Sequence, residues 1–328
     1  MRRRDFLRVA GGAALTGPTI SLAEPVKRVR QIGVLTSFGE GDKSGQSWLV
    51  AFRQKLLELG WVLARDYNVE YRFTAGDTNR MRTYAGELAA LKPDVILVAG
   101  TGVVGTARSL LTSLPVVFVQ VTDPVGTGFV GSLAHPGGNM TGFTSFEYSM
   151  GGKWLELLKE VQPAVSQVSV IENPDNANHI GYLSSIEDAA SAMHVRVISA
   201  GVRDPTEIDG AFKKIVGEGI GIIVPPDPFT LSLRGAIVAL ASRYRIPSVY
   251  AFRPFVVDGG LMCYGVDNDE MYRGAASYVS RILRGEKPAD LPVQASNKFV
   301  LTINMRAAQA IALAVPQTLL ARADEVIE

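Results

Sequence analysis

Short, almost wholly apolar segments alternate with amphipathic segments along most of this chain. Val95–Ala99 and Val116–Val121 are two of the apolar runs, and each is bounded by segments with helical spacing of apolar residues. Strands that are apolar on both faces must be covered on both faces, which is typical of a parallel sheet between two layers of helices. The first such unit is a strand at Gln31–Ser37 followed by a helix at Ser44–Leu59. The pattern predicts an α/β fold.

The alternation occurs twice, and a Gly-rich passage from Gly126 to Gly142 separates the two series. Four further strands are predicted after it, at Gln167–Glu172, Val195–Ala200, Gly221–Val224 and Ser248–Tyr250. The remaining segment, with strands predicted at Leu261–Tyr264 and Phe299–Ile303, a helix at Glu270–Arg284 and closing helices, is too small to fold alone. We therefore expect it to return to the first sheet and to end on the second.

The predicted architecture is two doubly wound parallel-sheet lobes joined by a multi-strand hinge. The first lobe is expected to contain residues 24–142 plus about 254–292, and the second residues 143–253 plus about 293–328. Several chain crossings of this kind allow two lobes to open and close as rigid bodies.

The first 23 residues have the features of an export signal. Arg2, Arg3, Arg4 and Arg8 form a basic start, an apolar stretch follows, and Ala23 ends a small-residue cleavage site. The Arg3–Arg8 segment resembles the twin-arginine consensus, which is read by a receptor and is not an anchor. The segment predicts export to the periplasm and cleavage after Ala23.

Charge and composition narrow the range of ligands. The chain of 328 residues has 33 Lys and Arg against 32 Asp and Glu, so its formal net charge of +1 gives no general attraction for nucleic acid. One cysteine, Cys263, and three scattered histidines make a disulfide or a metal site of the Cys/His type unexpected. We predict no nucleic-acid partner, no metal and no cofactor.

Polar and aromatic residues follow the predicted strands, where an open parallel sheet binds its ligands. The candidate ligand-binding residues are Ser37, Phe38, Thr101, Gly102, Thr122 and Asp123 in the first lobe, and Asn173, Asn176, Asp227, Phe229, Tyr250 and Phe252 in the second. Hydroxyl, amide and carboxylate groups beside aromatic rings suit a small polar solute with a flat apolar part. Each polar residue also has a purely structural alternative as a helix cap or turn residue.

One motif supports a different function. Gly100–Gly105 matches G-x-G-x-x-G, follows a predicted strand and precedes a helix, and Asp123 comes after the next strand. This is consistent with an exported NAD(P)-dependent oxidoreductase, although the fingerprint usually lies on the first strand of its domain and here follows the third. The chain has no G-x-S-x-G, H-E-x-x-H or Walker A sequence. We therefore expect a binding protein rather than an enzyme.

Seven dispersed passages carry a resemblance to a known family. They are Thr122–Gly126, His135–Gly142, Asn173–Pro174, Tyr264–Gly265, Gly285–Pro292, Ile303–Asn304 and Leu320–Glu328. Together they resemble the solute-binding components of ABC importers, in the family that includes tryptophan- and phenylalanine-binding proteins. The resemblance implies a type I periplasmic-binding-protein fold (periplasmic binding protein-like I) and a cleft that closes on an aromatic amino acid, an aromatic acid or a related amide. It also implies delivery to an inner-membrane permease with a cytoplasmic ATPase.

The chain departs from that family in its second lobe. Relatives that bind aromatic amino acids typically have Asp-Asn where this chain has Asp227-Pro228, so the amide of that pair is missing. A monomer is expected. A ligand sensor that docks to a membrane receptor would share the same fold, and the sequence does not separate it from an importer component.

Overall fold

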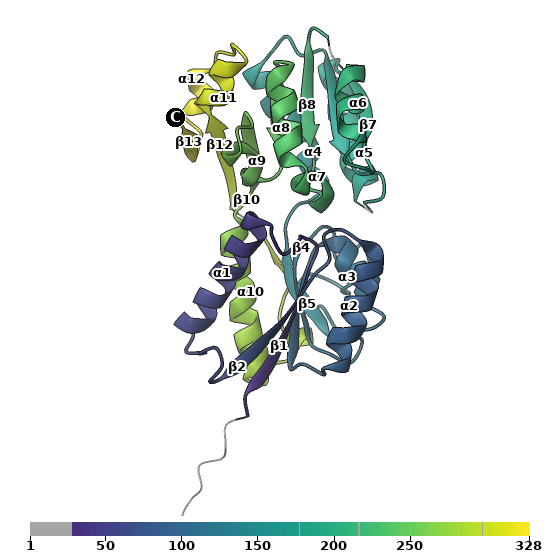
Figure 1. The fold of residues 1–328 in the computed structure, drawn as a ribbon, viewed down its shortest axis with the longest axis vertical. Helices are drawn as coiled ribbons and strands as arrows, with labels where there is room; N and C mark the ends of the chain where they lie inside the picture. The colour runs from purple at the N-terminus through teal and green to yellow at the C-terminus, as the bar shows by residue number, and fades with distance from the viewer. Residues whose placement is uncertain (1–27, 177, 216, 297) are drawn as a thin grey trace, which may run out of the picture.

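The computed structural model describes residues 28–328 apart from residues 177, 216 and 297. Two α/β lobes lie end to end, with the chain's C-terminus in the upper one (Figure 1). The predicted export signal, residues 1–23, lies outside the described residues. The predicted fold class, two lobes built on largely parallel sheets, is confirmed.

The first lobe contains a six-stranded parallel sheet in the order β11-β5-β4-β3-β1-β2. Its strands are β1 (Arg30–Thr36), β2 (Tyr67–Phe73), β3 (Val95–Ala99), β4 (Val116–Val121), β5 (Met140–Thr144) and β11 (Gln294–Ala295). Its helices are α1 (Lys43–Glu58), α2 (Thr78–Ala90), α3 (Thr101–Ala107) and α10 (Asn268–Leu283). Helices α1 and α10 pack together on one face, and α2 and α3 cover the other (Figure 1).

The second lobe contains a seven-stranded sheet in the order β13-β12-β10-β9-β8-β6-β7. Its strands are β6 (Gln167–Glu172), β7 (Arg196–Gly201), β8 (Ile220–Val224), β9 (Ser248–Tyr250), β10 (Met262–Val266), β12 (Phe299–Asn304) and β13 (Glu325–Ile327). Its helices are α4 (Met150–Val161), α5 (His179–Met193), α6 (Glu207–Ile215), α7 (Pro228–Ser232), α8 (Arg234–Arg243), α9 (Arg253–Val257), α11 (Met305–Ala310) and α12 (Gln317–Leu320). The β10–β12 pair is antiparallel, so the sheet is mixed at this edge.

The chain crosses between the lobes later than predicted. Helix α9 after its first residue, and all of strand β10, fall in the range 254–292 that the sequence predicts for the first lobe, but β10 pairs with β9 and β12 in the second sheet. The five-residue α9 is only about 7.5 Å long, so it returns the chain to a neighbouring strand position and not to the other lobe. The crossing follows β10 and leads into α10, and β11 still pairs with β5 in the first sheet.

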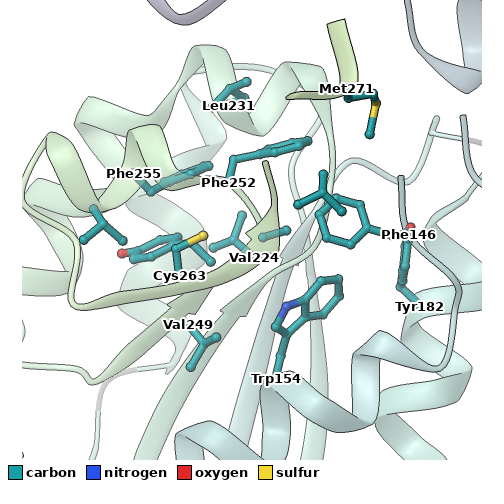
Figure 2. Close-up of a cluster of buried hydrophobic side chains, with 14 of the residues drawn as sticks. Phe146, Trp154, Tyr182, Val224, Leu231, Val249, Phe252, Phe255, Cys263 and Met271 are labelled. Atoms are coloured by element: carbon teal, nitrogen blue, oxygen red, sulfur yellow. The ribbon is translucent and has the colours of Figure 1, made fainter. Parts of the chain in front are cut away.

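Three chain segments join the lobes, after β5, before α10 and after β11. The first of them is anchored by Phe146, whose ring centroid lies 5.8 Å from Trp154, 6.0 Å from Phe252 and 6.3 Å from Phe299. Figure 2 shows Phe146 between Phe252 and Trp154, in the buried cluster that also contains Tyr182. The hinge therefore rests on an aromatic part of the second lobe's core.

Capping carboxylates fix where the long helices start. Asp42 Oδ1 accepts a hydrogen bond from the backbone N–H of Gly45 at the start of α1, and Asp267 Oδ1 accepts one from Glu270 N at the start of α10. These bonds satisfy backbone donors that a helix N-terminus leaves free. Two of the acidic residues nearest the lobe junction thus serve as helix caps.

Candidate functional site

A cavity of about 560 Å³ lies between the two lobes at the carboxyl ends of their strands. The first lobe contributes Ser37, Gly76, Thr78, Met81, Gly100, Thr101, Gly102, Val103, Gly105, Thr106, Gln120, Thr122, Thr127 and Phe129. The second lobe and the hinge contribute Ser145, Asn173, Asp175, Asn176, Asn178, Pro226, Asp227, Pro228, Phe229 and Phe252. Its size is within the range of small-molecule sites.

The first-lobe wall is held by a hydrogen bond between neighbouring strand ends and by close packing at a glycine. Thr101 is the first residue of α3, and its Oγ1 accepts a hydrogen bond from the backbone N–H of Thr122, at 2.9 Å, just past β4. Gly100 has φ of +103°, and a Cβ at this position would lie 3.1 Å from Ser37 Oγ. The glycine lets the chain turn sharply from β3 into α3 beside Ser37, so the ends of β1, β3 and β4 face one space.

The second-lobe wall centres on a buried carboxylate. Asp227 is 4% exposed, and its Oδ1 accepts a 2.7 Å hydrogen bond from Thr230 N as the cap of α7. Its Oδ2 accepts a 2.7 Å hydrogen bond from Asn176 Nδ2 and so fixes that side chain in the loop that follows β6. Burial raises the pKa of Asp227, and the hydrogen bonds from Thr230 and Asn176 oppose that shift.

The charge of the cavity has one sign. Among the described residues that line it, Asp175 and Asp227 carry carboxylates and none is Lys, Arg or His. Asp175 is exposed and forms an ion pair with Arg203 outside the cavity, at 3.2 Å. The buried charge that faces the cavity is therefore that of Asp227.

Among the described residues, two polar side-chain contacts bridge the lobes, and the first involves Thr122, which lines the cavity. The hydroxyls of Thr122 in the first lobe and Tyr182 in α5 lie 3.0 Å apart, and both side chains are buried. Asp42 Oδ2 at the start of α1 accepts a 3.0 Å hydrogen bond from Arg234 Nη1 at the start of α8. The lobes are thus held together by hydrogen bonds as well as by the hinge.

Nine of the twelve sequence candidates line this cavity: Ser37, Thr101, Gly102, Thr122, Asn173, Asn176, Asp227, Phe229 and Phe252. The other three are placed elsewhere by packing or by local bonds. Phe38 is buried against Trp48 and Phe73, with ring centroids 6.0 Å apart in both pairs. Tyr250 is fully buried and stacks on Phe255 at 4.5 Å, and burial raises its pKa.

Asp123 is exposed and closes a local turn. Its φ is +45°, and its Oδ1 accepts a 2.8 Å hydrogen bond from the backbone N–H of Gly126. The side chain is therefore folded back on its own loop instead of facing the cavity. The acidic residue proposed for a nucleotide ribose does not line the cavity into which Gly102 and Gly105 open.

Several residues that line the cavity are not among the candidates that the sequence predicts. Ser145 follows β5, a strand that begins inside the Gly-rich passage and was not expected. Gln120 lies within β4 at a register shift, with φ of +55°, and its Nε2 donates to Asn268 Oδ1 at 2.8 Å. Met81 and Phe129 come from α2 and a loop, not from strand ends. Recognising β5 would have pointed to Ser145, but no comparable signal marks the other three.

Within the described part of the chain, no helix combines the length and the apolar character that crossing a membrane requires.

Comparison with known proteins gives concordant matches. The profile of the ABC transporter substrate-binding protein family matches residues 49–327. A tyrosine-binding protein of Clostridioides difficile (strain R20291) is 26% identical over 280 residues, which span 85% of this chain and 79% of that protein.

Two solved structures have the same fold over nearly the whole described chain. A conserved domain protein of Vibrio cholerae O1 biovar El Tor superposes with a TM-score of 0.85 at 25% identity, covering 91% of this chain and 100% of that one. An ABC domain from Streptococcus pneumoniae in complex with L-Trp gives a TM-score of 0.84 at 24% identity, covering 92% and 100%.

Proposed function

Because the chain belongs to the ABC transporter substrate-binding protein family, we propose that it captures a small organic solute between its lobes and delivers it to a permease. The observation that carries the proposal is the cavity lined from both lobes by hydroxyl, amide and carboxylate groups together with apolar side chains. A solute held from both sides favours the closed arrangement of the lobes, because only that arrangement lets both walls contact it. No bond of the solute changes, so the protein is a binding component and not an enzyme.

The chemistry of the walls favours a solute with an amine or a neutral polar end. Asp227 is the buried charge of the cavity, and no described lining residue offers a cationic side chain to a free carboxylate. Among the three solute classes proposed, an aromatic amino acid or a related amide therefore fits better than an aromatic acid without an amine. The L-Trp bound by one relative and the name of the tyrosine-binding protein support the same choice.

The setting follows from the family and from the predicted export signal. The mature protein is proposed to act as a monomer in the periplasm and to dock to an inner-membrane permease with a cytoplasmic ATPase. A deletion strain is then expected to lose high-affinity uptake of the solute. Unchanged uptake together with a lost transcriptional or chemotactic response would favour the sensor alternative.

Titration calorimetry on the mature protein tests the binding step. We expect saturable binding of at least one of L-tyrosine, L-tryptophan, L-phenylalanine and L-phenylalaninamide, and weaker binding of 4-hydroxyphenylacetate, which lacks the amine. Preferential binding of the acid would overturn the solute class. Binding of NAD(P) with none of the amino compounds bound would instead support the oxidoreductase.

A further inference from the structure

The cavity extends beyond the lobe junction along one side of α3. The polar residues Thr101 and Thr122 lie at the junction, whereas Gly102, Gly105 and Thr106 line the cavity farther along the helix. Residues at positions i, i+3 and i+4 share one helix face, and Thr106 lies about 7.5 Å along the axis from Thr101. We call this part of the cavity, along Gly102, Gly105 and Thr106, the α3 annex. An amino-acid side chain is about long enough to extend into it from the lobe junction.

Two apolar side chains flank the annex. The sulfur of Met81 in α2 is 3.9 Å from Thr106 Oγ1, and Phe129 Cζ is 3.7 Å from the position of a Cβ on Gly105. Met81 belongs to the buried core cluster of the first lobe, and Phe129 packs against that cluster. The walls are therefore supported by packed core, so the shape of the annex is set before a solute enters.

The floor of the annex has little polar character. The hydroxyl of Thr106 donates to the carbonyl oxygen of Gly102 at 2.9 Å, so its one donor is used within the helix. A Cβ on Gly102 would meet no heavy atom within 4 Å. The missing side chains of Gly102 and Gly105 thus leave space along this face of α3, in the cavity that Met81 and Phe129 also line.

We propose that the α3 annex binds the apolar side group of the solute, and that Gly105 sets the size of the group that fits. This inference rests on the proposed function, since it assigns one part of the same cavity. It narrows the solute to amino compounds with an aromatic-sized side group, whose polar end lies at the junction beside Thr101 and Asn176. The proposal also explains the glycines of the Gly100–Gly105 motif without a bound dinucleotide.

The test uses L-alanine, L-leucine, L-phenylalanine and L-tryptophan, which share one polar end and differ in the apolar group. Binding to the mature wild-type protein is measured by calorimetry, and we expect affinity to rise about tenfold or more from alanine to tryptophan as apolar surface is buried. In Gly105→Leu, the new side chain occupies the annex. The ratio of the alanine affinity to the tryptophan affinity is then expected to rise about tenfold or more over its wild-type value.

Two further variants separate this effect from helix stability. Gly86→Leu places the same residue in the interior of α2 at a site with open space that does not line the cavity, and it should keep the wild-type order of affinities. Gly105→Ala adds only a methyl group in ordinary contact with Phe129, so it should fold even if the leucine variant does not, and it should weaken tryptophan more than phenylalanine.

The outcomes distinguish the two proposals. If the wild-type protein binds these amino acids but neither Gly105 variant changes their order, the annex assignment is wrong and the proposed function stands. If the wild-type affinity is the same for alanine, leucine, phenylalanine and tryptophan, the α3 annex does not bind the apolar side group and its assignment is wrong. If none of these compounds or the aromatic amides binds, the proposed solute class fails, and the annex assignment fails with it.

Discussion

Asp42 of the first lobe and Arg234 of the second form an ion pair of 3.0 Å across the lobe junction, with side chains 10% and 17% exposed. Asp42 also caps α1 through its other oxygen, and Arg234 Nε donates to Asp258 of its own lobe at 2.8 Å. The same two residues thus hold a helix end and a loop in their own lobes and join the lobes to each other. Opening the cleft must separate them.

Asp42→Asn removes the charge of this contact and keeps an oxygen for the α1 cap. A charge-assisted hydrogen bond of this kind contributes about 1–3 kcal/mol, so we expect the variant to populate the open arrangement more and to bind solute several-fold more weakly. Small-angle scattering of the free protein and calorimetry measure the two effects. Glu58→Gln is the control, because Glu58 pairs with Arg273 within the first lobe at 2.8 Å. Equal effects of both variants would contradict a role at the junction.

Tyr182→Phe removes the hydroxyl that meets Thr122 across the cleft. The partner hydroxyl is then left buried, which costs about 1–3 kcal/mol in the joined arrangement, so solute affinity is expected to fall. Tyr278→Phe offers a comparison, since that hydroxyl donates to Pro292 O inside the first lobe. We expect both variants to lower the melting temperature and only Tyr182→Phe to lower affinity. A normal dissociation constant for Tyr182→Phe would show that the Thr122 contact does not contribute to binding.

Glu172 at the end of β6 gives the stability a definite pH dependence. Its side chain is 3% exposed, its Oε1 accepts a 2.7 Å hydrogen bond from Ser199, and its Oε2 has no hydrogen-bond partner within the described part of the chain. Burial raises the pKa of Glu172, and the nearby Asp227 and Glu187 add to the shift, while Ser199 and His179 oppose it. The native state therefore holds this proton more tightly than the unfolded chain does.

Because the native state binds the proton more tightly, this group's contribution to the free energy of unfolding falls as the pH rises from about 4.3, the ordinary pKa of Glu, through the raised value. In Glu172→Gln the charge is absent at every pH and Ser199 keeps an acceptor. We expect the variant to exceed the wild type in free energy of unfolding at pH 8, with the difference shrinking toward pH 4. Urea denaturation at several pH values measures this. A difference that grows on acidification would reverse the sign of the argument.

The fold could be predicted largely because the buried strands are recognisable as short apolar runs. Val95–Ala99 is apolar at every position and is buried at every position in the structure. Which sheet a strand joins is a different question, since an apolar strand such as Met262–Val266 suits either lobe and only its pairing with β9 and β12 decides it. The family resemblance is confirmed by the profile match, and it rests on dispersed passages that no single spacing rule would find.

The residues that line the cavity were predictable where they follow the ends of strands, and less so where the direction of a side chain decides whether it lines the cavity. Ser37 and Phe38 are neighbours past the end of β1, yet one lines the cavity and the other packs against Trp48. Sequence adjacency does not reveal which way each side chain turns. Met81 and Phe129 reach the cavity from a helix and a loop, so their approach depends on tertiary packing alone.

Asp227→Ala tests the second-lobe wall most directly. The change removes the cap of α7, worth about 0.5–2 kcal/mol, and frees the Asn176 amide that Asp227 holds at 2.7 Å. It also removes the buried charge that favours a cationic end on the solute, so we expect amino compounds to bind about tenfold more weakly or worse, since a charged hydrogen-bond partner is lost.

Asp227→Asn separates the two roles, because it keeps a capping oxygen and loses the charge. Calorimetry with L-tryptophan and L-phenylalaninamide, alongside thermal melting, distinguishes the effects on affinity and stability. Undiminished affinity in both variants would mean that this carboxylate serves only to cap α7, and that the amine preference must arise elsewhere in the cavity.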